Sequence, residues 1–171
     1  MINAAVIGLG WWGRYIITSL QGKSDAIRFV RGADIDADAS QGFAEENGVR
    51  FSTDFADALG DDDVDAVILT TPHSLHEQQI TQAAAAGKHV FSEKPLALTK
   101  AGAASAVAAC QDAGLVLGIG HERRFEPALL EIKNLIDSGR LGTIQHVEAN
   151  FSHDSLAEVK AGDWRAAAAE S

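Results

Sequence analysis

The sequence predicts an α/β fold built on a doubly wound parallel sheet. Short apolar, strand-like segments alternate with helix-like segments up to about residue 121, and the first of them runs directly into a glycine-rich turn. The strand-like segments are apolar almost throughout, which is typical of strands that are covered on both faces. Because crossovers between parallel strands are right-handed, this alternation gives a Rossmann-type domain, which we expect over residues 1–121.

The expected elements follow one another at short intervals. Asp54 and Thr99 stand where helices should begin, and Gly48, Gly87 and Gly114 stand where helices should end. The expected strands cover residues 2–7, 27–33, 49–52, 65–70, 89–91 and 115–119, and the expected helices cover residues 12–20, 36–47, 55–59, 74–86, 99–114 and 125–137. A further strand-like alternation runs from Thr143 to Phe151.

The glycine-rich turn after the first strand has the pattern G-x-G-x-x-G, formed by Gly8, Gly10 and Gly13. Between a strand and a helix, this pattern predicts dinucleotide binding: Gly8 permits the tight turn, Gly10 lets the backbone approach a pyrophosphate, and Gly13 lets helix and strand pack closely. Trp11 and Trp12 lie inside the turn, and we expect one to cover the cofactor or the domain cleft and the other to join the core. The alternative is a glycine-rich turn of another α/β protein.

Asp34 stands at the end of the second expected strand, about 20 residues after the glycines. A carboxylate there accepts hydrogen bonds from the ribose hydroxyls and repels a 2′-phosphate, so Asp34 favours NAD over NADP. Asp36, two residues later, strengthens this preference slightly. The alternative role for Asp34 is an N-cap of the following helix, and the two roles are compatible.

Two further segments should lie beside the glycine turn, because open α/β sheets bind ligands at the carboxyl ends of their strands. Residues 70–73, which include Thr71 and Pro72, lie at the end of one expected strand, and residues 92–95, which include Glu93 and Lys94, follow another. We therefore expect these residues to meet the glycine turn at one edge of the sheet.

Composition narrows the function classes. The formal net charge of −10 disfavours nucleic acids and anionic membranes as partners. The single cysteine, Cys110, fits a small buried residue in a reducing compartment, and without a leader or spanning segment we expect a cytoplasmic protein. Asp61, Asp62 and Asp63 are interpreted as a solvated loop, not a metal site.

Taken together, these motifs resemble the glucose–fructose oxidoreductase / inositol dehydrogenase (Gfo/Idh/MocA-like) family over essentially the whole chain. The resemblance rests on residues 6–13, Asp34, residues 71–76, 86–96, 120–127 and 136–142. It implies an NAD(P)-dependent dehydrogenase of a sugar, cyclic polyol or related hydroxy compound. It also implies that Lys94 is catalytic and that His76 contacts the cofactor. His73 departs from the family pattern, which commonly has Asn there.

The role of Lys94 stays open at this stage. Removing hydride from a carbon that bears a hydroxyl requires a base or donor near that oxygen, so Lys94 either takes the proton or only polarises the oxygen. The alternative is a solvated lysine that closes a strand–turn.

Residues 122–171 resemble the start of the family's α+β substrate and oligomerisation domain, and Trp164-Arg165 resembles a pair that lies near the cofactor in the family. The glycine-rich turn and the helix with catalytic Asp and His that should follow are not in this sequence. We therefore expect a fragment of a longer, homo-oligomeric enzyme, in which cofactor binding survives better than turnover. The alternative is a non-catalytic dinucleotide-binding module or pseudoenzyme.

Overall fold

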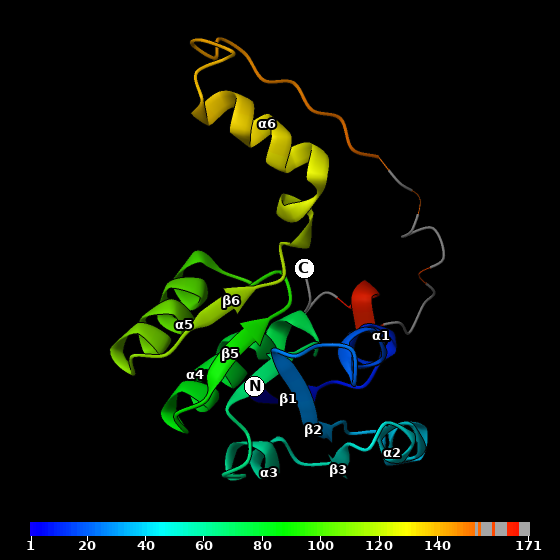
Figure 1. Cartoon of the computed structure of the whole chain (residues 1–171). Coiled ribbons are helices and arrows are strands. Elements are labelled where there is room, and N and C mark those ends of the chain that lie inside the picture. Colours follow the sequence, from blue (N-terminus) through cyan, green and yellow to red (C-terminus); the bar gives the residue numbers. More distant parts are fainter. Residues whose placement is uncertain (153, 155–158, 160–163, 168–171) are drawn as a thin grey trace. The chain divides into compact units, whose positions relative to one another are not determined.

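The structure is a computed structural model that describes residues 1–152, 154, 159 and 164–167. Residues Met1–Gly120 form one compact unit and His121–Ala167 another. The first unit contains a six-stranded parallel sheet with the strand order β3-β2-β1-β4-β5-β6 (Figure 1). The strands are β1 (Ile2–Ile7), β2 (Ile27–Ala33), β3 (Arg50–Ser52), β4 (Ala66–Leu69), β5 (His89–Ser92) and β6 (Leu117–Ile119). This is the predicted doubly wound Rossmann sheet, and its order reverses between β1 and β4, where such sheets bind ligands.

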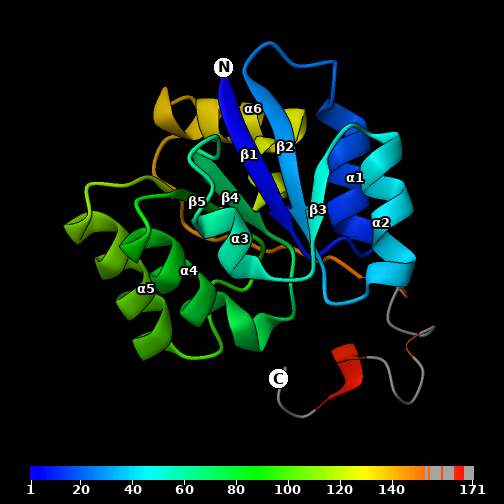
Figure 2. The ribbon, with the colours of Figure 1, turned by 90° about the horizontal axis from the view of Figure 1, so that it is seen from below.

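Helices cover both faces of the sheet. Figure 2 shows α1 and α2 on one side and α3, α4 and α5 on the other. Their bounds are α1 (Trp11–Leu20), α2 (Ala37–Glu46), α3 (Phe55–Leu59), α4 (His76–Ala85) and α5 (Lys100–Asp112). The expected helix over residues 74–86 is preceded by a 3-10 turn, η1 (His73–Leu75), so its α-helical part begins at His76.

Side-chain caps fix where the helices begin. The carboxylates of Asp36 and Asp54 accept hydrogen bonds from backbone N–H groups two or three residues later, and Thr99 accepts one from Gly102 at 3.0 Å. The predicted caps at Asp54 and Thr99 are therefore confirmed. The cap of α2 is Asp36, not Asp34.

The sheet divides the apolar core into two layers. Successive residues of β1 point to opposite faces, so Ala5 and Ile7 pack with α4 and α5, whereas Ala4 and Val6 pack with α1 and α2. Cys110 belongs to the first layer and is 1% exposed, which confirms its prediction as a small core residue.

The second unit contains the 3-10 helix η2 (Glu122–Phe125), the helix α6 (Pro127–Asp137) and the 3-10 turn η3 (Trp164–Ala166). The expected strand over residues 143–151 is wrong, because the structure gives these residues no strand. An alternating sequence becomes a strand only when a neighbouring strand accepts its backbone hydrogen bonds.

Within the part of the chain that the structure describes, no helix combines the length and apolar character needed to cross a membrane.

Candidate functional site

Four loops meet at the carboxyl edge of the sheet. The residue after each of four strands continues the hydrogen-bond ladder into its loop, with N–H to carbonyl distances of 2.8–2.9 Å. The donors are Gly8, Thr70, Glu93 and Gly120, after β1, β4, β5 and β6. The glycine turn, the Thr71–Pro72 segment and the Glu93–Lys94 segment therefore lie side by side.

The glycines of the turn have different surroundings. Gly8 has φ +94°, and a Cβ there would lie 2.9 Å from the carbonyl oxygen of Thr70. A Cβ on Gly13 would lie 2.0 Å from the carbonyl oxygen of Gly8, so α1 packs directly on the turn. A Cβ on Gly10, in contrast, would meet no described atom within 4 Å. Gly8 and Gly13 are thus required by packing, whereas Gly10 borders open space.

That open space adjoins the N-terminus of α1. Gly10 is the N-cap residue and, among the described residues, no side chain caps this end. The first intrahelical hydrogen bond runs from the N–H of Arg14 to the carbonyl of Gly10, at 3.1 Å. The N–H groups of Trp11, Trp12 and Gly13 point out of the helix end, together with the positive end of the helix dipole. This arrangement fits a pyrophosphate.

Asp34 connects the end of β2 to the glycine turn. Its Oδ2 accepts a hydrogen bond from the N–H of Leu9 at 2.6 Å, and its Oδ1 accepts one from the N–H of Asp36 at 2.9 Å. The carboxylate is half-buried, and each oxygen keeps a further lone pair. It can therefore hold the turn and accept a hydrogen bond from a ligand hydroxyl at the same time.

Thr70 ends the β4 ladder and holds the glycine turn from the other side. Its hydroxyl contacts the carbonyl oxygens of Gly8 at 2.6 Å and Ile7 at 3.0 Å. The sequence places Thr70 at the ligand edge, at the end of an expected strand, but does not predict its contacts with the glycine turn. The available signal was a hydroxyl residue immediately after an apolar strand of the central sheet.

His76 is fully buried on the first turn of α4. Its Nδ1 lies 2.7 Å from the carbonyl oxygen of Pro95, and its Nε2 lies 3.0 Å from the carbonyl oxygen of Thr71. Carbonyls only accept hydrogen bonds, so a neutral imidazole donates to one of them at a time. The ring thus links the loop after β4, with Thr71 and Pro72, to the loop after β5.

The Glu93 side chain, in the loop after β5, accepts two hydrogen bonds and packs closely against Gly120. Its Oε1 accepts a hydrogen bond from the indole N–H of Trp12 at 2.7 Å, and its Oε2 accepts one from the N–H of Lys94 at 3.2 Å. A Cβ on Gly120 would lie 2.6 Å from Oε1, so the carboxylate also fits closely against the end of β6. Lys94 itself is exposed, and its peptide bond to Pro95 is cis.

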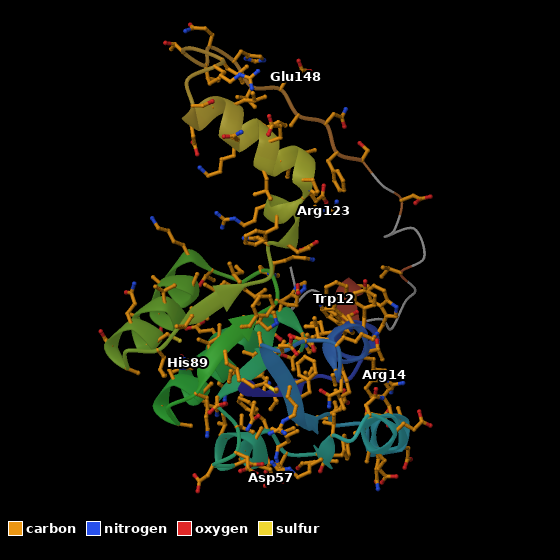
Figure 3. The ribbon with its side chains drawn as sticks, in the orientation of Figure 1. Trp12, Arg14, Asp57, His89, Arg123 and Glu148 are labelled. Carbon is orange, nitrogen blue, oxygen red and sulfur yellow. The ribbon has the colours of Figure 1, made fainter. Side chains whose placement is uncertain are left out.

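The two tryptophans form an aromatic group with Tyr15 on α1. Ring centroids lie 5.2–5.9 Å apart, Trp11 is 74% exposed and Trp12 is partly buried. The expectation that one tryptophan joins the core is therefore wrong. The Glu93 carboxylate holds the Trp12 indole at the edge of the sheet, where Figure 3 labels it.

The acidic run before β4 lies outside this site, on the side of α3 where Figure 3 labels Asp57. The prediction that the whole run is solvated is wrong for Asp61, whose carboxylate is 9% exposed and pairs with Arg31 at 2.8 Å and Arg50 at 2.9 Å. Burial by itself would raise the pKa of Asp61. The hydrogen bonds from Arg31 and the backbone of Asp63, with the charges of Arg50 and Arg31, outweigh burial and lower that pKa below its usual value. Among the described residues, no group of side chains has the composition of a metal site.

Comparison with known proteins agrees with this fold and site. Residues 2–121 match the Gfo/Idh/MocA family, described as an oxidoreductase family with an NAD-binding Rossmann fold. The chain belongs to this family. It is 34% identical over 142 residues to a scyllo-inositol 2-dehydrogenase (NAD(+)) of Bacillus subtilis. The aligned region covers 82% of this chain and 42% of that protein.

Solved structures give the same result. A scyllo-inositol dehydrogenase from Lactobacillus casei with bound NAD(H) and scyllo-inositol superposes with a TM-score of 0.76 at 31% identity, covering 83% of this chain and 42% of that one. A 3-ketoreductase from Actinomadura kijaniata in complex with TDP-benzene and NADP has a TM-score of 0.74 at 28% identity, covering 84% and 46%. The chain thus spans less than half the length of these relatives, and the family includes both NAD- and NADP-bound members.

Proposed function

We propose that this chain is the cofactor-binding part of an NAD(P)-dependent dehydrogenase that prefers NAD and acts on a sugar, cyclic polyol or related hydroxy compound. The observation that carries the proposal is the open space beside Gly10, next to the Asp34 carboxylate and at a helix end that no described side chain caps. The net charge of −10 supports small-molecule partners over nucleic acids or anionic membranes.

The residues around that space would each bind a different part of the dinucleotide. Backbone N–H groups of the turn and of the start of α1 would hold the pyrophosphate, and Asp34 would accept hydrogen bonds from the ribose hydroxyls. The loops with Thr71, Pro72 and Glu93 would border the nicotinamide half, and buried His76 would support both loops. When bound, the nicotinamide supplies the acceptor or donor for hydride transfer.

Lys94 is the proposed catalytic residue of this chain. It follows Glu93 at the carboxyl end of β5 and is exposed. An ammonium or amine at this place can hydrogen-bond the substrate hydroxyl and hold or remove its proton. The proposed substrate class is supported by the relatives, which include an enzyme with bound scyllo-inositol.

A titration with NADH and NADPH tests the cofactor assignment. We expect saturable binding of NADH, followed by its own fluorescence, and weaker binding of NADPH. Asp34→Asn should remove this preference, because the carboxylate that repels a 2′-phosphate is lost. Asp36→Asn is the matched control: it removes the same charge from the same turn, and asparagine also caps helices. Equal effects of the two variants would show that the preference for NADH over NADPH comes from the overall negative charge of this turn and not from Asp34 in particular.

The alternative is a non-catalytic dinucleotide-binding module, which would use the same open space beside Gly10 without turnover. Lys94→Met separates the two proposals. If the chain oxidises a polyol with NAD, this variant should bind NADH but lose turnover. If the chain binds NADH and neither protein shows turnover with a panel of polyols and sugars, the chain by itself is a binding module.

A further inference from the structure

A hydrogen bond joins the start of α1, which the proposed function assigns to the pyrophosphate, to the loop after β5, which carries Lys94. The indole N–H of Trp12, on the first turn of α1, donates to Oε1 of Glu93 at 2.7 Å. The two residues are 81 positions apart in the sequence, and both side chains are partly buried. The donor follows the glycine turn, and the acceptor immediately precedes Lys94.

The turn that carries Lys94 is held at both ends. Before Lys94, the carboxylate of Glu93 is fixed by Trp12, by the N–H of Lys94 and by close packing against Gly120. After Lys94, the carbonyl of Pro95 lies 2.7 Å from the buried ring of His76. Lys94 is exposed between these two anchors, so its position follows from theirs.

The Trp12 anchor differs from the His76 anchor in one respect. His76 is 0% exposed and belongs to the interior, whereas Trp12 stands at the helix end that borders the open space beside Gly10. Trp12 also stacks on Tyr15, with centroids 5.2 Å apart and planes 13° apart, which fixes its indole plane. A hydrogen bond to a carboxylate is shorter and stronger than one to a neutral acceptor.

We propose that Trp12 is a positioning residue, which holds the Glu93–Lys94 turn against the cofactor end of α1 and thereby keeps Lys94 beside the bound dinucleotide. This inference rests on the proposed function. Without the indole N–H, the turn loses its only described side-chain donor from α1 and is free to take other arrangements. Lys94 then spends a smaller fraction of time beside the dinucleotide, even when the cofactor site is full.

The test uses acylation of Lys94 by an amine-reactive ester, measured by mass spectrometry with and without NADH. NADH is added at saturation for each variant, so that differences in affinity drop out. In the unchanged protein we expect NADH to protect Lys94 and not Lys100, which is exposed on α5. Trp12→Phe keeps an aromatic ring, smaller than the indole, and removes the N–H. It should reduce the protection of Lys94 about threefold to tenfold, as expected for losing a hydrogen bond to a carboxylate at a partly exposed site.

Tyr15→Phe is the matched control, because it changes the same aromatic group and leaves the Trp12–Glu93 hydrogen bond in place; it should keep full protection. Glu93→Met removes the acceptor at similar length and should reproduce the effect of Trp12→Phe, which keeps the test decisive if one variant does not fold. Full protection of Lys94 in Trp12→Phe would overturn the positioning role while leaving the proposed function intact. If the unchanged protein binds neither NADH nor NADPH, the proposed function and the positioning role fail together.

Discussion

Alanine at Gly13 should mainly lower stability, whereas alanine at Gly10 should leave stability unchanged and weaken ligand binding, because one glycine is needed for packing and the other for the ligand. At Gly13 the new Cβ would lie 2.0 Å from the carbonyl oxygen of Gly8 and 2.9 Å from Oγ1 of Thr70. That carbonyl is itself held by Thr70 at 2.6 Å, so it cannot move without breaking this contact. Relief requires a shift of about 1 Å between α1 and the turn, and overpacking of this kind costs about 1–3 kcal/mol or more.

Alanine is a better helix former than glycine by about 1 kcal/mol, which offsets part of this cost. We expect a net loss of about 2 kcal/mol for Gly13→Ala, and a fall in melting temperature of about 8 °C for a domain of this size. Dinucleotide binding should weaken as well, because the turn that borders the site is displaced.

At Gly10 the Cβ meets no described atom within 4 Å, and φ −69° with ψ −169° suits alanine. Alanine is a poorer N-cap than glycine, but it lowers the entropy of the unfolded chain, and the two effects roughly cancel to within about 1 kcal/mol. The methyl group would, however, occupy the space assigned to the pyrophosphate. We expect Gly10→Ala to fold like the unchanged protein and to bind NADH at least about tenfold more weakly, a difference of about 1.4 kcal/mol.

Thermal unfolding and NADH titration of the two variants check this reasoning. A Gly13→Ala protein with unchanged stability would show that the contact between α1 and the turn is not tight. A Gly10→Ala protein with unchanged NADH affinity would show that the pyrophosphate does not approach Gly10, and would remove the main support for the proposed site.

Three other predictions concern stability and reactivity. His76→Ala should lower the free energy of unfolding by about 3 kcal/mol, because it leaves a cavity and removes the N–H donor that the two carbonyls share. His76→Asn should recover part of this loss in urea unfolding. The lowered pKa of Asp61 means that its ionised form stabilises the fold above about pH 3.9, and this contribution is lost as pH falls through the folded-state pKa. The difference in unfolding free energy between the unchanged protein and Asp61→Asn should therefore be constant from about pH 5 to 8 and shrink in stronger acid. A difference that grows in acid would contradict the assignment. Burial raises the pKa of the Cys110 thiol, so a thiol reagent should modify it only as fast as the first unit unfolds, and rapid labelling of the folded protein would show that this layer of the core opens.

Much of the first unit could be predicted from the sequence because its signals are local. An apolar segment, a glycine with few steric limits and an Asp or Thr before a helix each act on neighbouring residues, and β1, α3 and the caps at Asp54 and Thr99 lie where these signals place them. The placement of the glycine turn, Thr71 and Glu93 at one edge also followed, since parallel strands bring their carboxyl ends together.

Local signals failed where a residue's partner is distant in the sequence. The alternation over residues 143–151 is that of a strand, but no described strand offers it backbone hydrogen bonds. Asp61 belongs to a run that reads as a solvated turn, yet Arg31 and Arg50 on adjacent strands bury it as an ion pair. Trp12 reads as a residue of the glycine turn, and only the folded sheet brings its indole N–H to Glu93, 81 residues away.

The sequence by itself thus determined the Rossmann class, the order of the elements in the first unit and the residues gathered at its ligand edge, because backbone preference and apolar periodicity act over a few residues. The tertiary structure decided which groups at that edge hold one another. Asp34 holds the glycine turn through the N–H of Leu9, His76 joins the loops after β4 and β5, and Trp12 holds Glu93 beside Lys94. These contacts depend on directions and distances of a few ångströms between separate strands, and only assembly of the sheet sets them.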